Sequence, residues 1–213
     1  MTGTLHALVG GSNDIFATLR FFIKSGLYRR SRNLFQVAVH KRTKLTLGRG
    51  FTVEGKASLH LGDDGGHYPR HAASSLRVGD GAKLILEGNH RILSGHQMDI
   101  GPGAEIRFGG GYINHDARIS CQHRLTIGRG TIIGEDACIM DSDSHVLVGS
   151  AAPRGIEIGE HVWVGARVMI LKNSVLHDGA VVAAGAVVSG EFPPGSLIAG
   201  VPARVVRENV EWC

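Results

Sequence analysis

Apolar residues recur at every sixth position through residues 156–191, which form the most regular stretch of the chain. A long α-helix needs a period near 3.6 residues, and a half-buried strand needs a period of about 2. A period of six fits neither, but it fits a short strand and a turn that repeat as stacked coils. The pattern predicts a parallel β-helix with a column of aliphatic side chains as its core. The leading apolar positions are Ile158, Val164, Ile170, Leu176, Val182 and Val188.

A second set of small or β-branched residues lies four places after the leading ones. Small residues also follow most leading positions directly, and they leave room for sharp corners between short strands. Both sets are therefore expected to face inward or to form the corners of the coil. The second set is Val162, Val168, Ser174, Ala180 and Ala186.

The same spacing is present elsewhere in a less regular form. It begins near residue 45 with Leu47, Val53 and Leu59, and it ends before Phe192-Pro193-Pro194-Gly195. We therefore predict an all-β fold with three parts. Residues 1–44 form a basic N-terminal segment, residues 45–195 form the β-helix, and residues 196–213 form a final turn and tail.

One interruption of the repeat lies between two regular runs. The segment 141–157 begins with DSDSHVLVGSAAPRG, which is polar and carries Gly and Pro. A polar loop that leaves a rigid scaffold is a common place for chemistry. We therefore expect functional side chains in this loop.

The N-terminal segment holds eight Lys or Arg residues against Asp14 alone, within a chain of net charge +4. Residues 12–25 read as a short amphipathic helix. This helix either packs on the mouth of the β-helix, or residues 12–44 contact an anionic membrane or a lipid-linked glycan. No recognised nucleic-acid-binding motif accompanies the basic residues, so we expect no nucleic acid as a partner.

Composition narrows the class of protein further. The 213 residues include 31 Gly, few aromatic residues and three Cys. An odd number of Cys without a C-x-x-C pair argues against a disulfide scaffold and a zinc ribbon. We expect a cytoplasmic protein, with peripheral contact at the inner face of the membrane as an alternative, because we find neither a signal peptide nor a membrane span.

His145 is the strongest candidate for a catalytic residue. An imidazole has a pKa near neutrality and can act as a general base. Asp141 and Asp143 precede it in the loop, but on spacing alone such a loop histidine is more often only solvated. Asn114 could close a coil corner, where the left-handed conformation of Asn is tolerated. We expect no cysteine nucleophile, because Cys138 occupies a position of the interior type.

Three phrases of the sequence resemble known proteins. They are IEIGEHVWVGARVMI, VVAAGAVVSGEFPPGSLIAGVPARVVRE and DSDSH. They resemble the hexapeptide-repeat acyltransferases, among them the galactoside, maltose and polysaccharide O-acetyltransferases. The resemblance implies a left-handed coil, acetyl-CoA as co-substrate, a saccharide acceptor and a homotrimer with sites between subunits. It implies direct acyl transfer and no metal.

The resemblance also assigns roles to individual residues. It implies that His145 is the general base and that Asn114 orients the acceptor. Cys121 and Gln122 stand where galactoside enzymes have acidic residues, so the acceptor is left open, as are the roles of Asp141 and Asp143. The implied coenzyme A contacts are Trp163, Gly165, Ala166, Ala184, Ser189, Gly190, Arg204 and Arg207.

Other functions remain open from the sequence. The same repeat body is compatible with N-acetylation of an amino sugar or with a xenobiotic acetyltransferase. A protein of another class, similar to the γ-carbonic anhydrases, would bind zinc through three histidines. A catalytically silent scaffold would bind no acetyl-CoA. The histidines that raise the zinc alternative are His115, His123, His145, His161 and His177.

Overall fold

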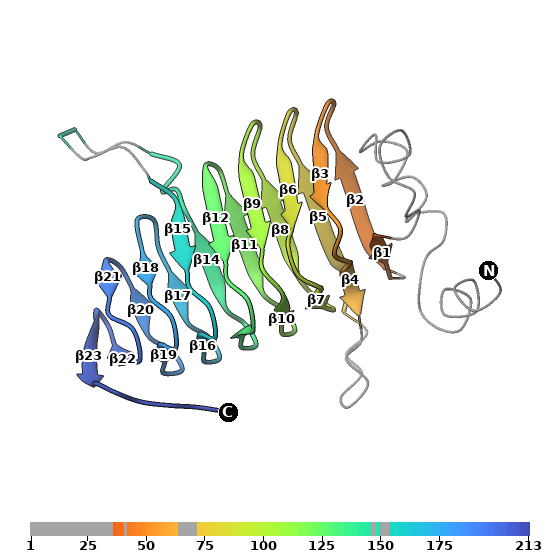
Figure 1. Cartoon of the computed structure of the whole chain (residues 1–213). Coiled ribbons are helices and arrows are strands. Elements are labelled where there is room, and N and C mark those ends of the chain that lie inside the picture. The colour runs from red at the N-terminus through yellow and green to blue at the C-terminus, as the bar shows by residue number, and fades with distance from the viewer. Residues whose placement is uncertain (1–35, 41, 64–71, 146–147, 150–153) are drawn as a thin grey trace.

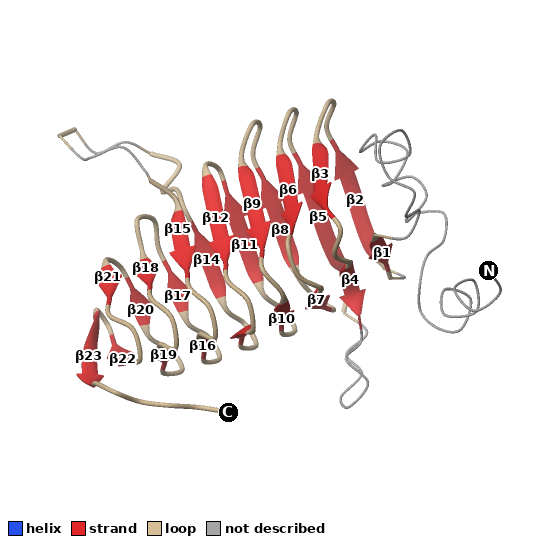
Figure 2. Ribbon diagram, in the orientation of Figure 1, coloured by secondary structure: helices blue, strands red, loops and turns tan. Residues whose placement is uncertain are grey.

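The computed structural model describes residues 36–213 apart from 41, 64–71, 146–147 and 150–153. The described chain is a left-handed parallel β-helix, which confirms the predicted fold class. Figure 2 shows strands and loops along its whole described length. The helix predicted at residues 12–25 lies outside the described residues, as does most of the segment predicted to contact a membrane.

In the described part of the chain, twenty-three strands form three sheets, which are the three sides of the coil. The first sheet contains β1 (Val37–Val39), β4 (Leu59–Asp63), β7 (His90–Leu93), β10 (Gly111–Ile113), β13 (Thr131–Ile133), β16 (Trp163–Val164), β19 (Val181–Val182), β22 (Leu197–Gly200) and β23 (Ala203–Arg207). The second sheet contains β2 (Thr43–Leu47), β5 (Ser74–Val78), β8 (Gln97–Ile100), β11 (Arg118–Cys121), β14 (Cys138–Met140), β17 (Met169–Ile170) and β20 (Val187–Val188). The third sheet contains β3 (Thr52–Gly55), β6 (Lys83–Leu86), β9 (Glu105–Phe108), β12 (Arg124–Ile127), β15 (Ile156–Ile158), β18 (Val175–Leu176) and β21 (Glu191–Phe192).

Each coil places one strand in each sheet, and strands of successive coils pair in parallel. In the second half Trp163 pairs with Val181, three hexads along the chain. In the first half Gly111 pairs with Thr131, so these coils need more residues for one turn. Figure 1 shows the coils becoming shorter from the N-terminal to the C-terminal end. The longer early coils explain why the six-residue spacing is irregular there.

The core is the stacked aliphatic column that the repeat predicts. All six leading residues are buried, and so are the five residues of the second set. Neighbouring coils come close at the glycines that follow leading residues. A Cβ on Gly165 would lie 2.7 Å from the backbone nitrogen of Ala184. This contact shows that the small residue is needed for stacking.

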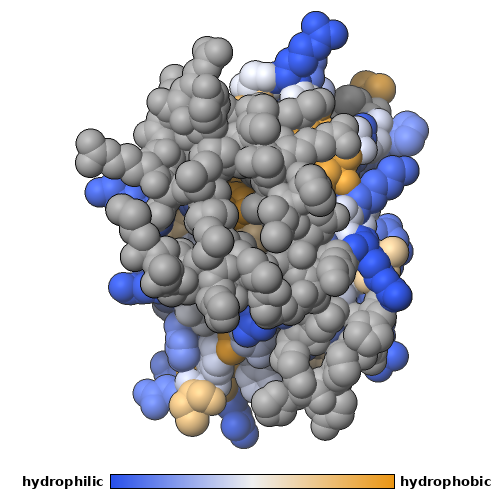
Figure 3. Space-filling model, turned by 90° about the vertical axis from the view of Figure 1, so that its right-hand side faces the viewer, coloured by the Kyte–Doolittle hydropathy of each residue, from blue (hydrophilic) through white to orange (hydrophobic). Residues whose placement is uncertain are grey.

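The three sheets differ in the side chains that they turn outward. The third sheet carries charged residues, such as Glu105, Arg107 and Arg124. The first sheet carries a registered row of larger apolar side chains, which are Tyr112, Ile132, Trp163, Val181 and Leu197. Seen from its N-terminal end, the described surface is largely hydrophilic with a few apolar patches (Figure 3).

The two ends of the coil differ from the predicted boundaries. β1 pairs with β4 and so begins the coil before residue 45. The six-residue spacing misses this strand because the coil that joins it to β4 is longer than three hexads. At the other end β22 continues the first sheet, and β23 folds back antiparallel on it. Residues 197–207 are therefore part of the β structure.

Candidate active site

The predicted site residues lie mainly on two edges of the coil. We call the corners that lead from the first sheet to the second the Asn114 edge. We call the corners that lead from the second sheet to the third the loop edge, because the segment after Met140 leaves there and returns at Ile156. The strands of the second sheet run from one edge to the other, and β11 alone has four residues. At about 3.3 Å per residue, the two edges are at least about 13 Å apart in one chain.

His145 lies on the loop edge and is exposed. Its Nδ1 atom is 3.2 Å from the backbone carbonyl oxygen of Asp143. A carbonyl oxygen only accepts hydrogen bonds, so this contact places the ring proton on Nδ1. The lone pair then resides on Nε2, which is the state that a general base requires.

Asp141 anchors the first turn of the loop. Its buried carboxylate accepts hydrogen bonds from the backbone N–H groups of Gln122 (2.6 Å), His123 (2.8 Å) and Arg124 (2.8 Å). Gln122 and His123 form the corner between β11 and β12 of the preceding coil, and Arg124 begins β12. Asp141 therefore has a structural role, which the sequence left open.

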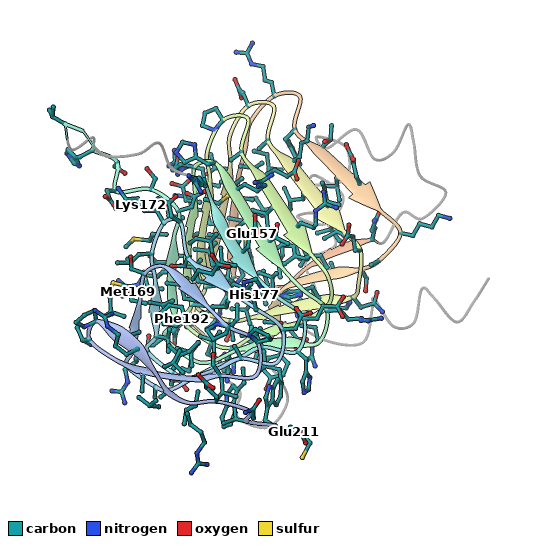
Figure 4. All side chains as sticks on the ribbon, turned by 60° about the vertical axis from the view of Figure 1, so that its left-hand side comes forward. Glu157, Met169, Lys172, His177, Phe192 and Glu211 are labelled. Atoms are coloured by element: carbon teal, nitrogen blue, oxygen red, sulfur yellow. The ribbon has the colours of Figure 1, made fainter. Side chains whose placement is uncertain are left out.

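Asp143 is held by a second contact. Lys172 Nζ lies 2.5 Å from its Oδ2 atom, and the Lys172 side chain is 22% exposed. Lys172 belongs to the loop edge of the next coil, after β17. Figure 4 shows Lys172 and Met169 on the side of the molecule from which the loop leaves, whereas Glu157 and His177 face another side. The loop is thus fixed to the coil on either side of it.

The Asn114 edge collects a second group of predicted residues. Asn114 Oδ1 accepts a hydrogen bond from the N–H of His115 at 2.8 Å, and the Asn114 N–H donates to Ile133. Two coils further on, the Gly165 N–H donates a hydrogen bond to the Val182 carbonyl, and the Ala166 carbonyl accepts one from the Gly185 N–H. Ala184, which is exposed, lies at the same edge in the following coil. The asparagine thus lies in one line with these small residues.

Arg204 ends this line. It pairs with Ala199 in the β22–β23 hairpin, close to the corner where the Asn114 edge would continue. Its exposed guanidinium donates to the carbonyl of its neighbour Ala203 at 2.7 Å. An exposed guanidinium at the end of a row of small residues is suited to a phosphate group.

Not all predicted coenzyme contacts join this line. Ser189 and Gly190 follow β20 and therefore lie on the loop edge with His145. Arg207 lies at the far end of β23, opposite Leu197. One chain therefore does not bring together all the residues that the resemblance implies.

Trp163 points outward from the first sheet and is 46% exposed. Its ring lies 6.0 Å from that of Trp212 in the C-terminal tail. The Trp212 ring stacks on His161 at 4.0 Å, and its Nε1 donates to the His161 carbonyl at 3.0 Å. The tail thus folds back beside Trp163, which the sequence did not predict.

Cys121 is poorly suited to act as a nucleophile. Cys121 faces the interior, and burial raises the pKa of its thiol, with the nearby Asp141 carboxylate adding to the effect. Cys138 was expected to face the interior as well. It instead pairs with the outward-facing Arg118 and Met169, and it lines a groove of about 490 Å³ on the outer face of the second sheet. Cys138 is 9% exposed there.

The repeat itself matches a known family model. Residues 155–190 match the family described as bacterial transferase hexapeptide (six repeats). The chain carries the hexapeptide repeat of the bacterial transferases. This match confirms the resemblance on which the site was predicted. It covers the Asn114 edge from Gly165 to Ala184, and it does not reach Asn114 or His145.

Several curated relatives of this hexapeptide-repeat protein are named as acetyltransferases. An Escherichia coli K12 protein, provisionally named a lipopolysaccharide biosynthesis O-acetyl transferase (WbbJ), is 31% identical over 114 residues, which cover 45% of this chain and 56% of that protein. The galactoside O-acetyltransferase of the same strain is 31% identical over 103 residues, which cover 46% of this chain and 50% of the enzyme. The chain therefore spans about half the length of these relatives.

A solved structure, that of the polysialic-acid-specific acetyltransferase NeuO, is 19% identical, with a TM-score of 0.45 and a coverage of 84% of this chain and 88% of that one. Within the residues that the structure describes, no helix has the length and apolar character needed to cross a bilayer.

Sequence reasoning missed two anchoring residues. Nothing in the sequence indicated the role of Lys172, because its partner Asp143 is far from it in the sequence and comes close only through stacking of the coils. The anchoring role of Asp141 follows from a corner of the preceding coil, which the loop motif does not include.

Proposed function

We propose that this protein is an acetyl-CoA-dependent O-acetyltransferase that acts on a saccharide. The observation that carries the proposal is the His145 imidazole, oriented by the Asp143 carbonyl in an anchored loop of a hexapeptide-repeat coil. The names of the relatives support the acetyl group and the saccharide class.

The reaction that we propose is a direct transfer between two bound substrates. His145 Nε2 removes the proton from an acceptor hydroxyl, and the oxygen attacks the thioester carbonyl. The tetrahedral intermediate expels the coenzyme A thiolate, which takes the proton from the imidazolium. No acyl-enzyme is needed, and the buried Cys121 thiol with its raised pKa is not suited to form one.

We further propose that the protein is a homotrimer and that each site lies between two copies. Asn114 and His145 lie on different edges of one chain, with the second sheet between them. Asn114 of one copy would then orient the acceptor for His145 of its neighbour. Coenzyme A would lie along the Asn114 edge beside Ala166 and Ala184, with its phosphates at Arg204.

Titration calorimetry of the purified full chain with acetyl-CoA tests the proposal. We expect saturable binding in the micromolar range, followed by release of free thiol when a saccharide acceptor is added. A sample that binds no acetyl-CoA at millimolar concentration would refute the transferase function. Binding and turnover only with amino-sugar acceptors, with an N-acetylated product, would replace O-acetylation by N-acetylation.

A further inference from the structure

Two histidines and one aspartate gather at the N-terminal end of the first sheet, away from the predicted acetyl-transfer residues. His40 follows β1, and His60 and Asp63 belong to β4. One ligand atom of each lies within 4.8 Å of the others. The imidazole rings of His40 and His60 are 6.0 Å apart between centroids, with an angle of 47° between their planes.

A local irregularity of β4 creates this arrangement. Side chains of a regular strand alternate between its faces, so residues three apart point to opposite sides. The register of β4 against β7 shifts between Leu61 and Asp63, because Gly62 is an extra residue in the ladder. Such a bulge re-aims the side chain that follows it. It turns Asp63 to the outer side, where His60 already lies.

Gly62 also lets the two coils approach each other. Its φ of 81° is in the left-handed region, which favours glycine. A Cβ there would lie 2.4 Å from Thr43 Oγ1 and 3.5 Å from the Cβ of His40. The absence of a side chain at residue 62 therefore avoids a clash with Thr43, which follows His40 in the neighbouring coil, whereas the contact with His40 would be an ordinary one.

The neighbours of the cluster support the orientation of its carboxylate. Arg91 pairs with His60 across the ladder, and its Nε donates to Asp63 Oδ2 at 2.7 Å. A ligating carboxylate is usually held by a second partner of this kind. His40 is 8% exposed, so the cluster is partly withdrawn from water.

We propose that His40, His60 and Asp63 bind one Zn²⁺ ion. Two imidazoles and one carboxylate are a ligand set that zinc uses, and each bond is about 2 Å long. Ligand atoms around one zinc ion are then about 3 to 3.5 Å apart. Side-chain rotations that move the three ligand atoms by about 1 to 2 Å would bring them to this spacing. A water molecule can take the fourth position.

The ion would join the corner after β1 to the next coil. Among the described residues, β1 is the last strand of the first sheet at this end, and its only partner strand there is β4. A terminal coil has only one neighbour to stabilise it. Zinc would therefore stabilise the end of the coil, and this role does not depend on acetyl transfer.

Equilibrium dialysis with metal analysis tests the site on the full chain without an affinity tag. The protein is first treated with a chelator and is then dialysed against Zn²⁺ at about 0.1 to 100 µM. This range brackets the low micromolar affinity that we expect. We expect about one ion per chain at low micromolar Zn²⁺ and a rise in the melting temperature. Mg²⁺ should give neither effect, because it prefers oxygen ligands.

Two variants decide where the ion binds. His60→Ala removes a half-exposed ligand and should weaken zinc binding at least tenfold, while its melting temperature without zinc stays close to that of the parent chain. His123→Ala, an exposed histidine elsewhere on the coil, should bind zinc as the parent does. No saturable binding below 100 µM, or equal binding by the parent and His60→Ala, would overturn the proposal.

Discussion

Among the described residues, one hydrogen bond, to the Asp143 carbonyl, orients the His145 ring and leaves its Nε2 atom for chemistry. We predict that His145→Ala keeps the melting temperature of the parent chain, because the side chain is exposed. Its turnover should fall at least about 100-fold, which is typical of a lost general base. Release of coenzyme A thiol with saturating acetyl-CoA and acceptor measures this.

His123→Ala is the matched control for that variant, because it removes an exposed imidazole from the same edge. Its turnover should equal that of the parent. Turnover of His145→Ala within about threefold of the parent would remove His145 from the mechanism.

The buried Asp141 carboxylate satisfies three backbone N–H groups. Removing it leaves these donors without their partner, which costs stability. We predict that Asp141→Ala lowers the free energy of unfolding by about 3 kcal/mol in urea denaturation. Asp141→Asn keeps one oxygen and should lose less. Equal stability of both variants and the parent would show that the anchor has no energetic role.

His90 lies fully inside the coil, with its ring 4.5 Å from that of Phe108. Burial lowers the pKa of this imidazole to about 3. Below pH 6.5, the ordinary pKa of histidine, His90 binds a proton in the unfolded chain but stays neutral in the folded chain. Stability should therefore fall as the pH falls from about 6.5 toward 3, by up to about 1.4 kcal/mol per pH unit from this group.

His90→Leu tests this effect. Its unfolding free energy should depend less on pH between 4 and 6.5, a range set by the two pKa values of this group. The buried His96 also has a lowered pKa and keeps a slope in both proteins. Urea denaturation at several pH values gives both slopes, and identical slopes would contradict the prediction.

Residues whose role depends on a motif could be predicted, and residues whose role depends on stacking could not. The DSDSH motif singled out His145. The partners of Asp141 and Asp143, at residues 122–124 and at Lys172, come close only because one coil lies on another. The His60–Asp63 pair depends on a bulge, which no six-residue pattern reveals.

At the scale of the element, the β22–β23 hairpin presents Arg204 at the end of the Asn114 edge. We predict that Arg204→Ala raises the KM for acetyl-CoA about tenfold, which corresponds to about 1.4 kcal/mol of lost phosphate contact. Its kcat at saturating acetyl-CoA should change little. Initial rates over a range of acetyl-CoA concentrations separate the two constants.

Arg129→Ala is the control for charge alone, because Arg129 is exposed and pairs with Glu160 at 2.9 Å. Its KM should remain that of the parent. If both variants raise the KM equally, the effect belongs to overall charge and not to Arg204.

The elements of the second half were predictable to within a residue or two, because each strand is one short part of a hexad. Those of the first half were harder, because Gly111 and Thr131 are paired across more than three hexads. β23 was expected as a tail, since its residues no longer carry the spacing. Its antiparallel course depends on the turn after Gly200, which the repeat does not encode.

At the scale of the whole molecule, the separation of the two edges leads to a test of assembly. Asn114→Ala and His145→Ala should each be nearly inactive alone. When both are made in one cell, mixed assemblies of the proposed trimer would form sites with Asn114 from one copy and His145 from the other. For random assembly, about a quarter of the sites are intact, so we predict about a quarter of the parent activity.

Light scattering should show a mass of about three chains for the parent and for the mixture, as closed symmetric assembly requires. A mixture that is no more active than the single variants would place both residues of a site in the same chain. A stable monomer with full activity would refute the trimer altogether.

The antiparallel course of β23 determines whether another molecule can add strands to the C-terminal end of the β-helix. A β-helix of stacked parallel strands can in principle be extended by another molecule, since its last coil resembles those before it. β22 would offer such a template, but β23 already occupies its edge and runs in the opposite direction. A second molecule that arrives in register finds a strand of the wrong polarity on this side. The hairpin therefore blocks extension of the first sheet at its C-terminal end.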